Sequence, residues 1–389
     1  MRDIGWRDKK HMAALRILVV DDSVVIRKVL SETLASDQEL EIVGIASDGK
    51  IGLAKIAQLH PDLVTLDVEM PVMNGLEALV EVRKLYPQLP VIMFSTLTER
   101  GAAATLDALS LGASDYVTKP SNTGSMAGAI ERIKADLIPK IKALCGRRRP
   151  KPGQASPVVV APPPVIRPRP KSGIRRPIQI VAIGTSTGGP NALAEVLPRI
   201  PRDFPVPIVA VQHMPPLFTK MLADRLASRA NIPIEEGMAD TTLTPGHAWL
   251  APGNFHMTVR HAGVSWRIGL NQEAPENSCR PAVDVLFRSV ASAFGPNALA
   301  VVMTGMGSDG LLGAKKICEA GGQVIVQDEA SSVVWGMPGA VYNSGVADAS
   351  YPLNQLAAEI TRRVLDSRNL SQRDTPAHLD PNSIYTPVK

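Results

Sequence analysis

Short apolar runs alternate with amphipathic stretches along the first third of the chain. Residues 15–20 are apolar except for one arginine and stop abruptly at acidic residues, which is typical of a buried strand in a parallel sheet. A helical pattern begins after Ser23, a favourable N-cap residue, and continues to Leu34. The pattern predicts a doubly wound α/β domain with five parallel strands over residues 14–138. Its other strands are expected at 41–46, 62–66, 90–95 and 114–118, and its other helices at 49–58, 75–85, 99–110 and 124–143.

The alternation resumes after residue 177 and predicts a second doubly wound, Rossmann-like α/β domain over residues 178–367. Residues 232–270 are rich in turns and short apolar runs, which indicates a β insert. Strands are expected at 178–183, 206–211, 298–303 and 323–327, and helices at 190–197, 217–230, 281–293, 310–320 and 353–365.

Proline-rich sequence separates the two predicted domains. We expect residues 139–177 to form a semi-stiff linker, because residues 146–176 contain eight prolines, which remove hydrogen-bond donors and keep the backbone extended. Residues 1–13 and 368–389 are expected to form a disordered extension and a disordered tail.

The net charge of +5 does not indicate a surface that binds nucleic acid. Residues 145–176 contain nine Lys and Arg and no acidic residue, so subtracting these charges from +5 leaves −4 for the rest of the chain. The positive excess therefore belongs to the basic linker, and we predict no nucleic-acid partner.

Hydropathy and cysteine spacing predict a cytoplasmic protein. No run of 18 apolar residues is present, so direct membrane insertion is not expected. The first residues are charged and lack the apolar core of a signal peptide. The three cysteines are widely spaced and form neither a metal-binding nor a disulfide pattern, which favours a reducing compartment.

Acidic residues follow two strands that should be neighbours in the first sheet. Asp21 and Asp22 come directly after the first strand, and Asp67 follows the third. Three carboxylates this close repel one another unless a cation lies among them, and Mg²⁺ suits oxygen ligands and an incoming phosphate. Ser95 and Lys119 follow the fourth and fifth strands, where they can bind a phosphoryl group by a hydrogen bond and a point charge.

These residues and their surroundings resemble the flavodoxin-like receiver domains of two-component response regulators. The resemblance rests on the double Asp, on Leu66–Gly75 (LDVEMPVMNG) and on Asp115–Pro120 (DYVTKP). It implies that Asp67 accepts phosphate from a histidine kinase. It also implies that the Glu69 carbonyl joins the three aspartates around Mg²⁺, and that Tyr116 reports phosphorylation through its rotamer.

A second set of reactive residues lies at strand ends of the second domain. The sequence Gly184–Gly188 matches G-x-S-x-G between a predicted strand and a predicted helix, where a sharp turn exposes the serine and the helix N-terminus offers N–H groups to an oxyanion. Ser186 is therefore a candidate nucleophile. His213 follows the next apolar strand and is the best candidate base, and Asp309 follows a later strand and can orient it.

This half resembles the catalytic domain of chemotaxis protein-glutamate methylesterases. The resemblance implies that Ser186 is the nucleophile, His213 the base and Asp309 its orienting residue, with a backbone N–H of Met306 in the oxyanion hole. Thr187 and Gly188 would support that site. The motifs that carry it are Gly184–Pro190, Val211–Met214, Leu250–Gly253, Pro281–Phe287 and Thr304–Gly310.

The two resemblances together imply a phosphorylation-activated hydrolase of glutamate γ-methyl esters on chemoreceptors, with a glutamine deamidase side activity and no cofactor for the esterase reaction. They also imply an intramolecular interface in which the unmodified receiver covers the esterase site. A linker of about 30 residues reaches roughly 30 Å, so it keeps the two domains together.

Two other functions fit parts of the sequence. Gly305, Gly307 and Gly310 match the dinucleotide fingerprint, and Asp328 stands where an acid would bind the ribose, so a nucleotide-dependent oxidoreductase is the second hypothesis. The third is a regulator whose output domain binds a protein or DNA without catalysis. Neither explains a serine and a histidine at adjacent strand ends.

Overall fold

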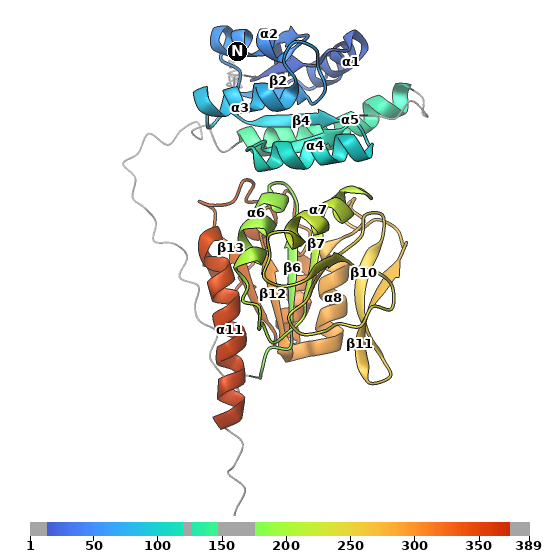
Figure 1. Cartoon of the computed structure of the whole chain (residues 1–389), viewed down its shortest axis with the longest axis vertical. Helices are drawn as coiled ribbons and strands as arrows, with labels where there is room; N and C mark the ends of the chain where they lie inside the picture. Colours follow the sequence, from blue (N-terminus) through green and yellow to red (C-terminus); the bar gives the residue numbers. More distant parts are fainter. Residues whose placement is uncertain (1–13, 120–125, 147–175, 374–389) are drawn as a thin grey trace, which may run out of the picture.

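The computed structural model describes residues 14–119, 126–146 and 176–373, which form two α/β domains, each built on its own main sheet (Figure 1). The predicted N-terminal extension, Pro120, most of the predicted linker and residues 374–389 lie outside the described residues.

The N-terminal sheet is parallel and has the strand order β2-β1-β3-β4-β5, which confirms the flavodoxin-like prediction. Its strands are β1 (Leu15–Val20), β2 (Leu40–Ala46), β3 (Leu63–Asp67), β4 (Val91–Ser95) and β5 (Asp115–Thr118). Its helices are α1 (Val24–Ala35), α2 (Gly49–Leu59), α3 (Gly75–Leu85), α4 (Glu99–Ser110) and α5 (Met126–Cys145).

Helices cover both faces of this sheet, which explains why its strands are almost continuously apolar. Successive residues of β1 point to opposite faces. Ile17 and Val19 belong to the buried cluster that includes residues of α1 and α5, whereas Leu18 and Val20 belong to the cluster that includes residues of α2, α3 and α4. Because β1 lies between β2 and β3, the polar residues that follow β1 and β3 come together at one edge.

The C-terminal sheet is also parallel, with seven strands in the order β14-β13-β12-β6-β7-β9-β8. A separate antiparallel hairpin is formed by β10 (His256–Ala262) and β11 (Ser265–Asn271). The sheet strands are β6 (Ile180–Thr185), β7 (Ile208–Gln212), β8 (Ile234–Glu236), β9 (Ala248–Leu250), β12 (Ala298–Val302), β13 (Gln323–Gln327) and β14 (Ala349–Tyr351). The helices are α6 (Gly189–Val196), α7 (Phe218–Ala227), α8 (Val283–Phe294), α9 (Leu311–Glu319), α10 (Met337–Asn343) and α11 (Leu353–Arg373).

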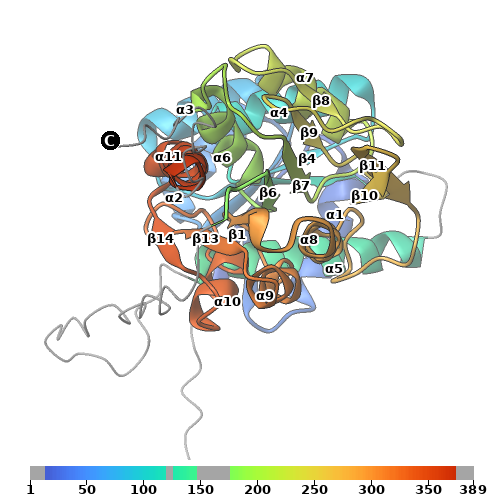
Figure 2. The same cartoon turned by 90° about the horizontal axis from the view of Figure 1, so that it is seen from below.

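This sheet too is covered on both faces, with α6, α7 and α11 on one side and α8, α9 and α10 on the other (Figure 2). The alternation along β6 shows why: Val181 and Ile183 pack in the cluster that contains α6 and α7, and Ile180 and Ala182 in the cluster that contains α8 and α9. The carboxyl ends of β6, β7 and β12 therefore deliver their following loops to one edge.

The structure differs from the predicted elements mainly where segments are short or where their strands join different sheets. The predicted β insert is divided, because β8 and β9 extend the main sheet and β10 and β11 form the hairpin. We did not predict α10, of 7 residues, or β14, of 3 residues, since such short segments carry little periodicity. Helix α5 ends at Cys145, close to the predicted helix end at residue 143, but it runs past the predicted domain boundary at 138, because Leu144 and Cys145 are buried in the N-terminal core.

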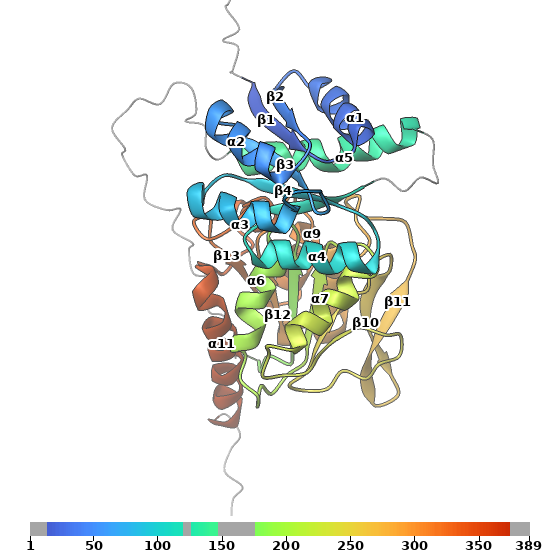
Figure 3. The ribbon, with the colours of Figure 1, turned by 45° about the horizontal axis from the view of Figure 1, so that its top comes forward.

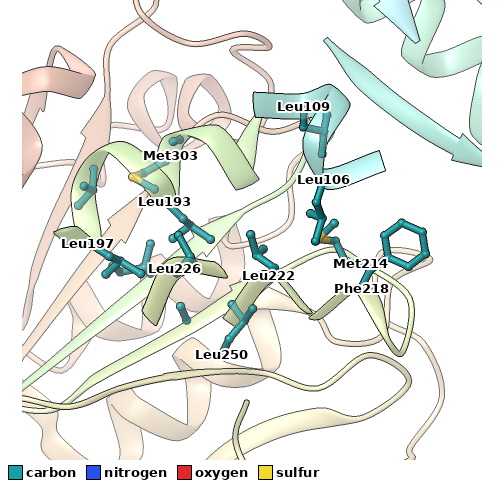
Figure 4. Packing of buried hydrophobic residues seen from close by; sticks show 14 of the residues in the cluster. Leu106, Leu109, Leu193, Leu197, Met214, Phe218, Leu222, Leu226, Leu250 and Met303 are labelled. Atoms are coloured by element: carbon teal, nitrogen blue, oxygen red, sulfur yellow. The ribbon is translucent and has the colours of Figure 1, made fainter. Parts of the chain in front are cut away.

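The two domains pack directly against each other, with α4 of the first lying on α6 and α7 of the second (Figures 1 and 3). Leu106 and Leu109 of α4 belong to the same buried cluster as Leu193, Phe218 and Leu222 (Figure 4). Because these side chains are buried, the contact shields apolar surface from water and stabilises this arrangement of the domains.

Candidate active site

The acidic residues of the N-terminal domain form one compact cluster. One carboxylate oxygen from each of Asp21, Asp22 and Asp67 lies within 4.8 Å of the others. Lys119 Nζ lies 3.0 Å from Asp21 Oδ2 and 2.8 Å from Asp67 Oδ2. Hard oxygen donors at this spacing fit Mg²⁺, and the lysine partly neutralises the cluster. The side chain of Glu69, whose carbonyl we predicted as a further ligand, pairs with Arg100 at 3.1 Å.

Burial governs the ionisation of this cluster. It raises the pKa of Asp67 to about 6, the charge of Asp21 adds to the rise, and Lys119 opposes it. Burial also raises the pKa of Asp21, again against the effect of Lys119. Binding of any cation or proton that reduces the negative charge therefore stabilises the cluster.

Ser95 and Tyr116 connect this cluster to the domain interface. Ser95 Oγ accepts a 2.6 Å hydrogen bond from Thr105 Oγ1 and lies 3.3 Å from the Gly101 carbonyl, both on α4. Tyr116 is buried, and its ring stacks on Phe218 of α7 with ring centroids 5.0 Å apart and an interplanar angle of 7°. Ser95 thus contacts the helix that packs on the second domain, and Tyr116 contacts the second domain itself.

Ser186 occupies the sharp turn between β6 and α6, as the sequence predicted. Its N–H donates to the Thr304 carbonyl at 3.1 Å, and Gly188, with φ 77°, allows the chain to turn into the helix. Gly305 lies so close that a Cβ there would stand 2.9 Å from Ser186 Cβ. The half-buried Ser186 is thus held between its own turn and the backbone at residues 304–305.

His213 and Asp309 are in direct contact although they are distant in sequence. His213 Nε2 lies 2.7 Å from Asp309 Oδ2, and the Asp309 side chain is only 2% exposed. The same carboxylate accepts backbone hydrogen bonds from Val283 at 2.7 Å and Asp284 at 2.9 Å, the first residues of α8. A helix N-terminus favours a negative charge, so Asp309 is positioned as an ionised partner for the imidazole.

The turn at 276–279 adds residues that the sequence analysis missed. Asn277 Nδ2 donates to Asp309 Oδ1 at 2.9 Å and to Asp284 Oδ2 at 3.0 Å. Cys279 Sγ lies 3.4 Å from His213 Nδ1. No periodic or motif signal marks these positions; only their place just before the Pro281–Phe287 motif could have drawn attention to them.

The hydrogen bonds around His213 hold it in its charged form. Burial alone would lower the pKa of His213, but the hydrogen bonds to Asp309 and then to Cys279 raise it to about 9. For Asp309, burial acts to raise the pKa, and the hydrogen bond and charge of His213 with the N–H donors of α8 bring it below its usual value. Both shifts act in the direction of an imidazolium–carboxylate pair.

A cavity of about 280 Å³ lies over these residues and is lined by both domains. The C-terminal domain contributes Ser186, Thr187, His213, Cys279 and Met306 among others. The N-terminal domain closes the opposite side with Asp115, Tyr116, Thr118, Asp136 and Lys140. Ser186 and His213 therefore line one cavity, and the N-terminal domain closes its opposite side.

Comparison with known proteins agrees with this architecture. A family model described as response regulator receiver domain matches residues 17–131, and one described as CheB methylesterase matches residues 181–360. The protein-glutamate methylesterase/protein-glutamine glutaminase of Trichodesmium erythraeum is 53% identical over 91% of this chain and 100% of that protein. The protein of the same name from Nocardioides sp. is 50% identical over 92% of this chain and 97% of that protein.

The chain belongs to the protein-glutamate methylesterase/protein-glutamine glutaminase family. Among solved structures, the CheB methylesterase catalytic domain of Thermotoga maritima is 39% identical, covers 48% of this chain and 98% of that chain, and has a TM-score of 0.47. In the parts of the chain that the structure describes, no helix is both long and apolar enough to cross a membrane.

Polar contacts join the receiver domain to the methylesterase domain beside Ser186. Thr187 Oγ1 donates a 2.7 Å hydrogen bond to Asp115 Oδ2, and both side chains are buried. Asn191 Nδ2 donates to the Leu109 carbonyl at 2.7 Å, and Arg225 pairs with Asp107 at the rim. The receiver thus contacts the residue that follows Ser186.

The glycine-rich loop of the methylesterase domain is part of this site and does not form a nucleotide cradle. Gly305 packs closely against the side chains of Ser186 and Met337. Asp328, the expected ribose ligand of the second hypothesis, accepts hydrogen bonds from the N–H and hydroxyl of Ser331 at 2.9 and 2.6 Å. The dinucleotide fingerprint is therefore a coincidence of spacing.

Proposed function

We propose that this protein hydrolyses glutamate γ-methyl esters of chemoreceptors, with Ser186 as nucleophile, His213 as base and Asp309 as the residue that orients the imidazole. The observation that carries the proposal is the 2.7 Å contact between His213 and Asp309 at the edge where Ser186 lines the same cavity. The similar proteins are named protein-glutamate methylesterase/protein-glutamine glutaminase, which supports this substrate class.

The reaction follows from the side-chain chemistry. Ser186 Oγ attacks the ester carbonyl and His213 takes its proton through Nδ1, because Nε2 faces Asp309. The tetrahedral oxyanion accepts hydrogen bonds from backbone N–H groups at Met306 and at the α6 N-terminus, where Thr187 and Gly188 lie. The proton then passes to the departing methoxide, methanol leaves, and water hydrolyses the acyl-enzyme to the glutamate carboxylate and free Ser186.

The same steps release ammonia from a glutamine side chain, since an amide carbonyl is attacked in the same way. Ammonia is the poorer leaving group, so we expect deamidation to be slower than demethylation. The reaction uses only protein groups and water, and the esterase step needs no cofactor.

We further propose that the receiver controls access to Ser186. A phosphoryl group on Asp67, donated by a histidine kinase, would draw Lys119 and Ser95 toward it. Asp21, Asp22 and Asp67, with the Glu69 carbonyl, would hold the Mg²⁺ that supports this transfer. Because Ser95 is bonded to α4 and Tyr116 stacks on Phe218, their movement would loosen the interface that covers the cavity.

Methanol release tests the proposal. The full chain, incubated with methylated chemoreceptor, Mg²⁺ and a small phosphodonor, should release methanol, whereas Ser186→Ala should release none above background. Ser228→Ala, which removes an exposed hydroxyl after α7, is the matched control and should behave as the parent. Normal methanol release by Ser186→Ala would exclude this nucleophile.

The domain division belongs to the same proposal. We predicted a receiver at 14–138 and a methylesterase at 178–367. Because α5 runs to Cys145 and α11 to Arg373, we now propose that the receiver ends with α5 and the methylesterase with α11, joined by the remaining basic linker in a cytoplasmic protein. The direct contacts of α4 with α6 and α7 support regulation within one chain.

A further inference from the structure

Residues 276–279 form a tight turn whose backbone geometry aims Cys279 into the cavity. Glu276 and Cys279 exchange two backbone hydrogen bonds, of 3.1 and 2.9 Å. The two central residues, Asn277 and Ser278, both have positive φ, 53° and 61°. Neither is glycine, and two adjacent residues in this region of φ persist only where surrounding contacts hold them.

The contacts that hold the turn lead to the catalytic pair. Asn277 bridges Asp309 and Asp284, and Cys279 Sγ contacts His213 Nδ1 at 3.4 Å. One turn therefore reaches both members of the His213–Asp309 pair. Cys279 is not in a disulfide and lines the same cavity as Ser186.

The contact occupies the nitrogen that the proposed reaction needs. With Nε2 bonded to Asp309, only Nδ1 can take a proton from Ser186. If the thiol donates to Nδ1, the lone pair is occupied; if the imidazolium donates to sulfur, Nδ1 already carries a proton. Within the described residues no hydrogen bond joins Ser186 Oγ to His213, whereas the Cys279 contact is present.

We propose that Cys279 is a positioning residue of the esterase, whose thiol holds Nδ1 of His213 in the resting protein and must release it before Ser186 can be deprotonated. This inference rests on the proposed function. The receiver would limit the access of substrate to the cavity. The Cys279 contact would be a second restraint, which acts on the base His213.

The other charged groups near His213 do not reach Nδ1. Asp309 faces Nε2, and Asp284 is separated from the ring by Asn277 and Asp309. Lys140 Nζ is paired with Asp136 at 2.9 Å and with Asp115 at 3.6 Å. Glu276 is paired with Arg288, and the guanidinium of Arg280 is bonded to Asn254, Gln272 and Glu273. Cys279 is thus the group positioned to change the proton affinity of Nδ1.

The rate at which Ser186 reacts with diisopropyl fluorophosphate reports how readily His213 accepts the serine proton, without the natural substrate. Ser186 Oγ bonds to phosphorus, fluoride leaves, and His213 takes the serine proton, so mass spectrometry of the intact full chain follows the rate. In Cys279→Ala the acidic limb of the pH–rate profile should move down by about one pH unit, and the rate at pH 7 should rise about tenfold, since a lost hydrogen bond to a charged group changes proton affinity by roughly this amount.

Two variants and one spectrum complete the test. Cys279→Ser keeps a donor at Nδ1 and should fall between parent and Cys279→Ala, while Cys318→Ala, which changes a thiol outside the cavity, should match the parent. The ¹⁵N resonance of His213 Nδ1 should shift in Cys279→Ala more than that of Nε2. Unchanged thermal unfolding shows that the fold is kept.

Two results would overturn the inference. A Cys279→Ala protein with the parent's acidic limb and rate would show that the thiol does not limit the base. A Cys279→Ala protein that no longer reacts with the fluorophosphate would show that the thiol takes part in the chemistry. Failure of the proposed function is separate: it would be methanol release that survives Ser186→Ala, whatever residue stands at 279.

Discussion

Thr187 Oγ1 donates a 2.7 Å hydrogen bond to Asp115 Oδ2, and this bond joins the residue after the proposed nucleophile to the last strand of the receiver. Asp115 is buried and also lies 3.6 Å from Lys140 Nζ. The receiver domain is therefore hydrogen-bonded to the turn that carries the proposed nucleophile.

Asp115→Asn should raise methanol release in the absence of a phosphodonor. The substitution removes the negative charge that accepts the Thr187 hydroxyl, and a hydrogen bond to a charged group contributes about 1.5–3 kcal/mol, so we expect a rise of roughly ten- to hundredfold. Asp107→Asn is the matched control, since its pair with Arg225 is about half exposed on the acid, 51%, and should have a smaller effect. Equal basal rates for parent and Asp115→Asn would contradict receiver cover through this bond.

Asn277→Ala should lower kcat with little change in KM. Asn277 donates to both Asp309 and Asp284, and without it the two buried carboxylates face each other with one donor fewer. Loss of a hydrogen bond to a charged group costs about 1.5–3 kcal/mol, so kcat should fall roughly ten- to hundredfold.

Asn277→Asp sharpens this prediction because it has nearly the same shape but adds a third carboxylate. Its loss of kcat should be larger than that of Asn277→Ala and should diminish as the pH falls. Steady-state kinetics across pH would separate the two, and the idea fails if both variants keep the parent kcat.

The folded protein should lose stability relative to Asp67→Asn as pH rises from about 4 to above 6. Burial raises the pKa of Asp67 from 3.8 to about 6, so the folded state binds more protons than the unfolded state in this interval. The stabilising contribution is complete below pH 3.8 and is lost as pH rises through 6. The difference in free energy of unfolding should change by up to roughly 3 kcal/mol across the window, as urea unfolding at several pH values would reveal. A pH-independent difference would mean that the carboxyl titrates normally.

Mg²⁺ should raise the thermal unfolding temperature of the full chain through Asp21, Asp22 and Asp67. A ligand at 100 times its dissociation constant stabilises by about 2.7 kcal/mol, and protons should compete with it below about pH 6, where Asp67 protonates. Asp67→Asn should abolish most of the effect, and Asp37→Asn, outside the cluster, should keep it. Equal stabilisation of all three proteins would place the ion elsewhere.

Sequence patterns identified the parts of the molecule that depend on local order along the chain. Apolar runs located the central strands because a strand covered on both faces needs an unbroken apolar stretch. Residues at or soon after the ends of those strands, such as Asp67, Ser186, His213 and Asp309, could be grouped, because parallel strands deliver their carboxyl ends to one edge. The short α10 and β14 escaped prediction because they are held by packing against their neighbours.

The sequence by itself determined the two folds and predicted the residues of both sites, whereas only the tertiary structure decided which side chains contact them. Cys279 meets His213 across 66 positions and Thr187 meets Asp115 across 72, with loop paths and domain packing between them. Periodicity reports which face of an element is buried, but such contacts depend on where a turn points and how two finished surfaces fit. The proposed catalytic residues could therefore be predicted from strand ends, whereas the contacts proposed to restrain them form only when the chain folds.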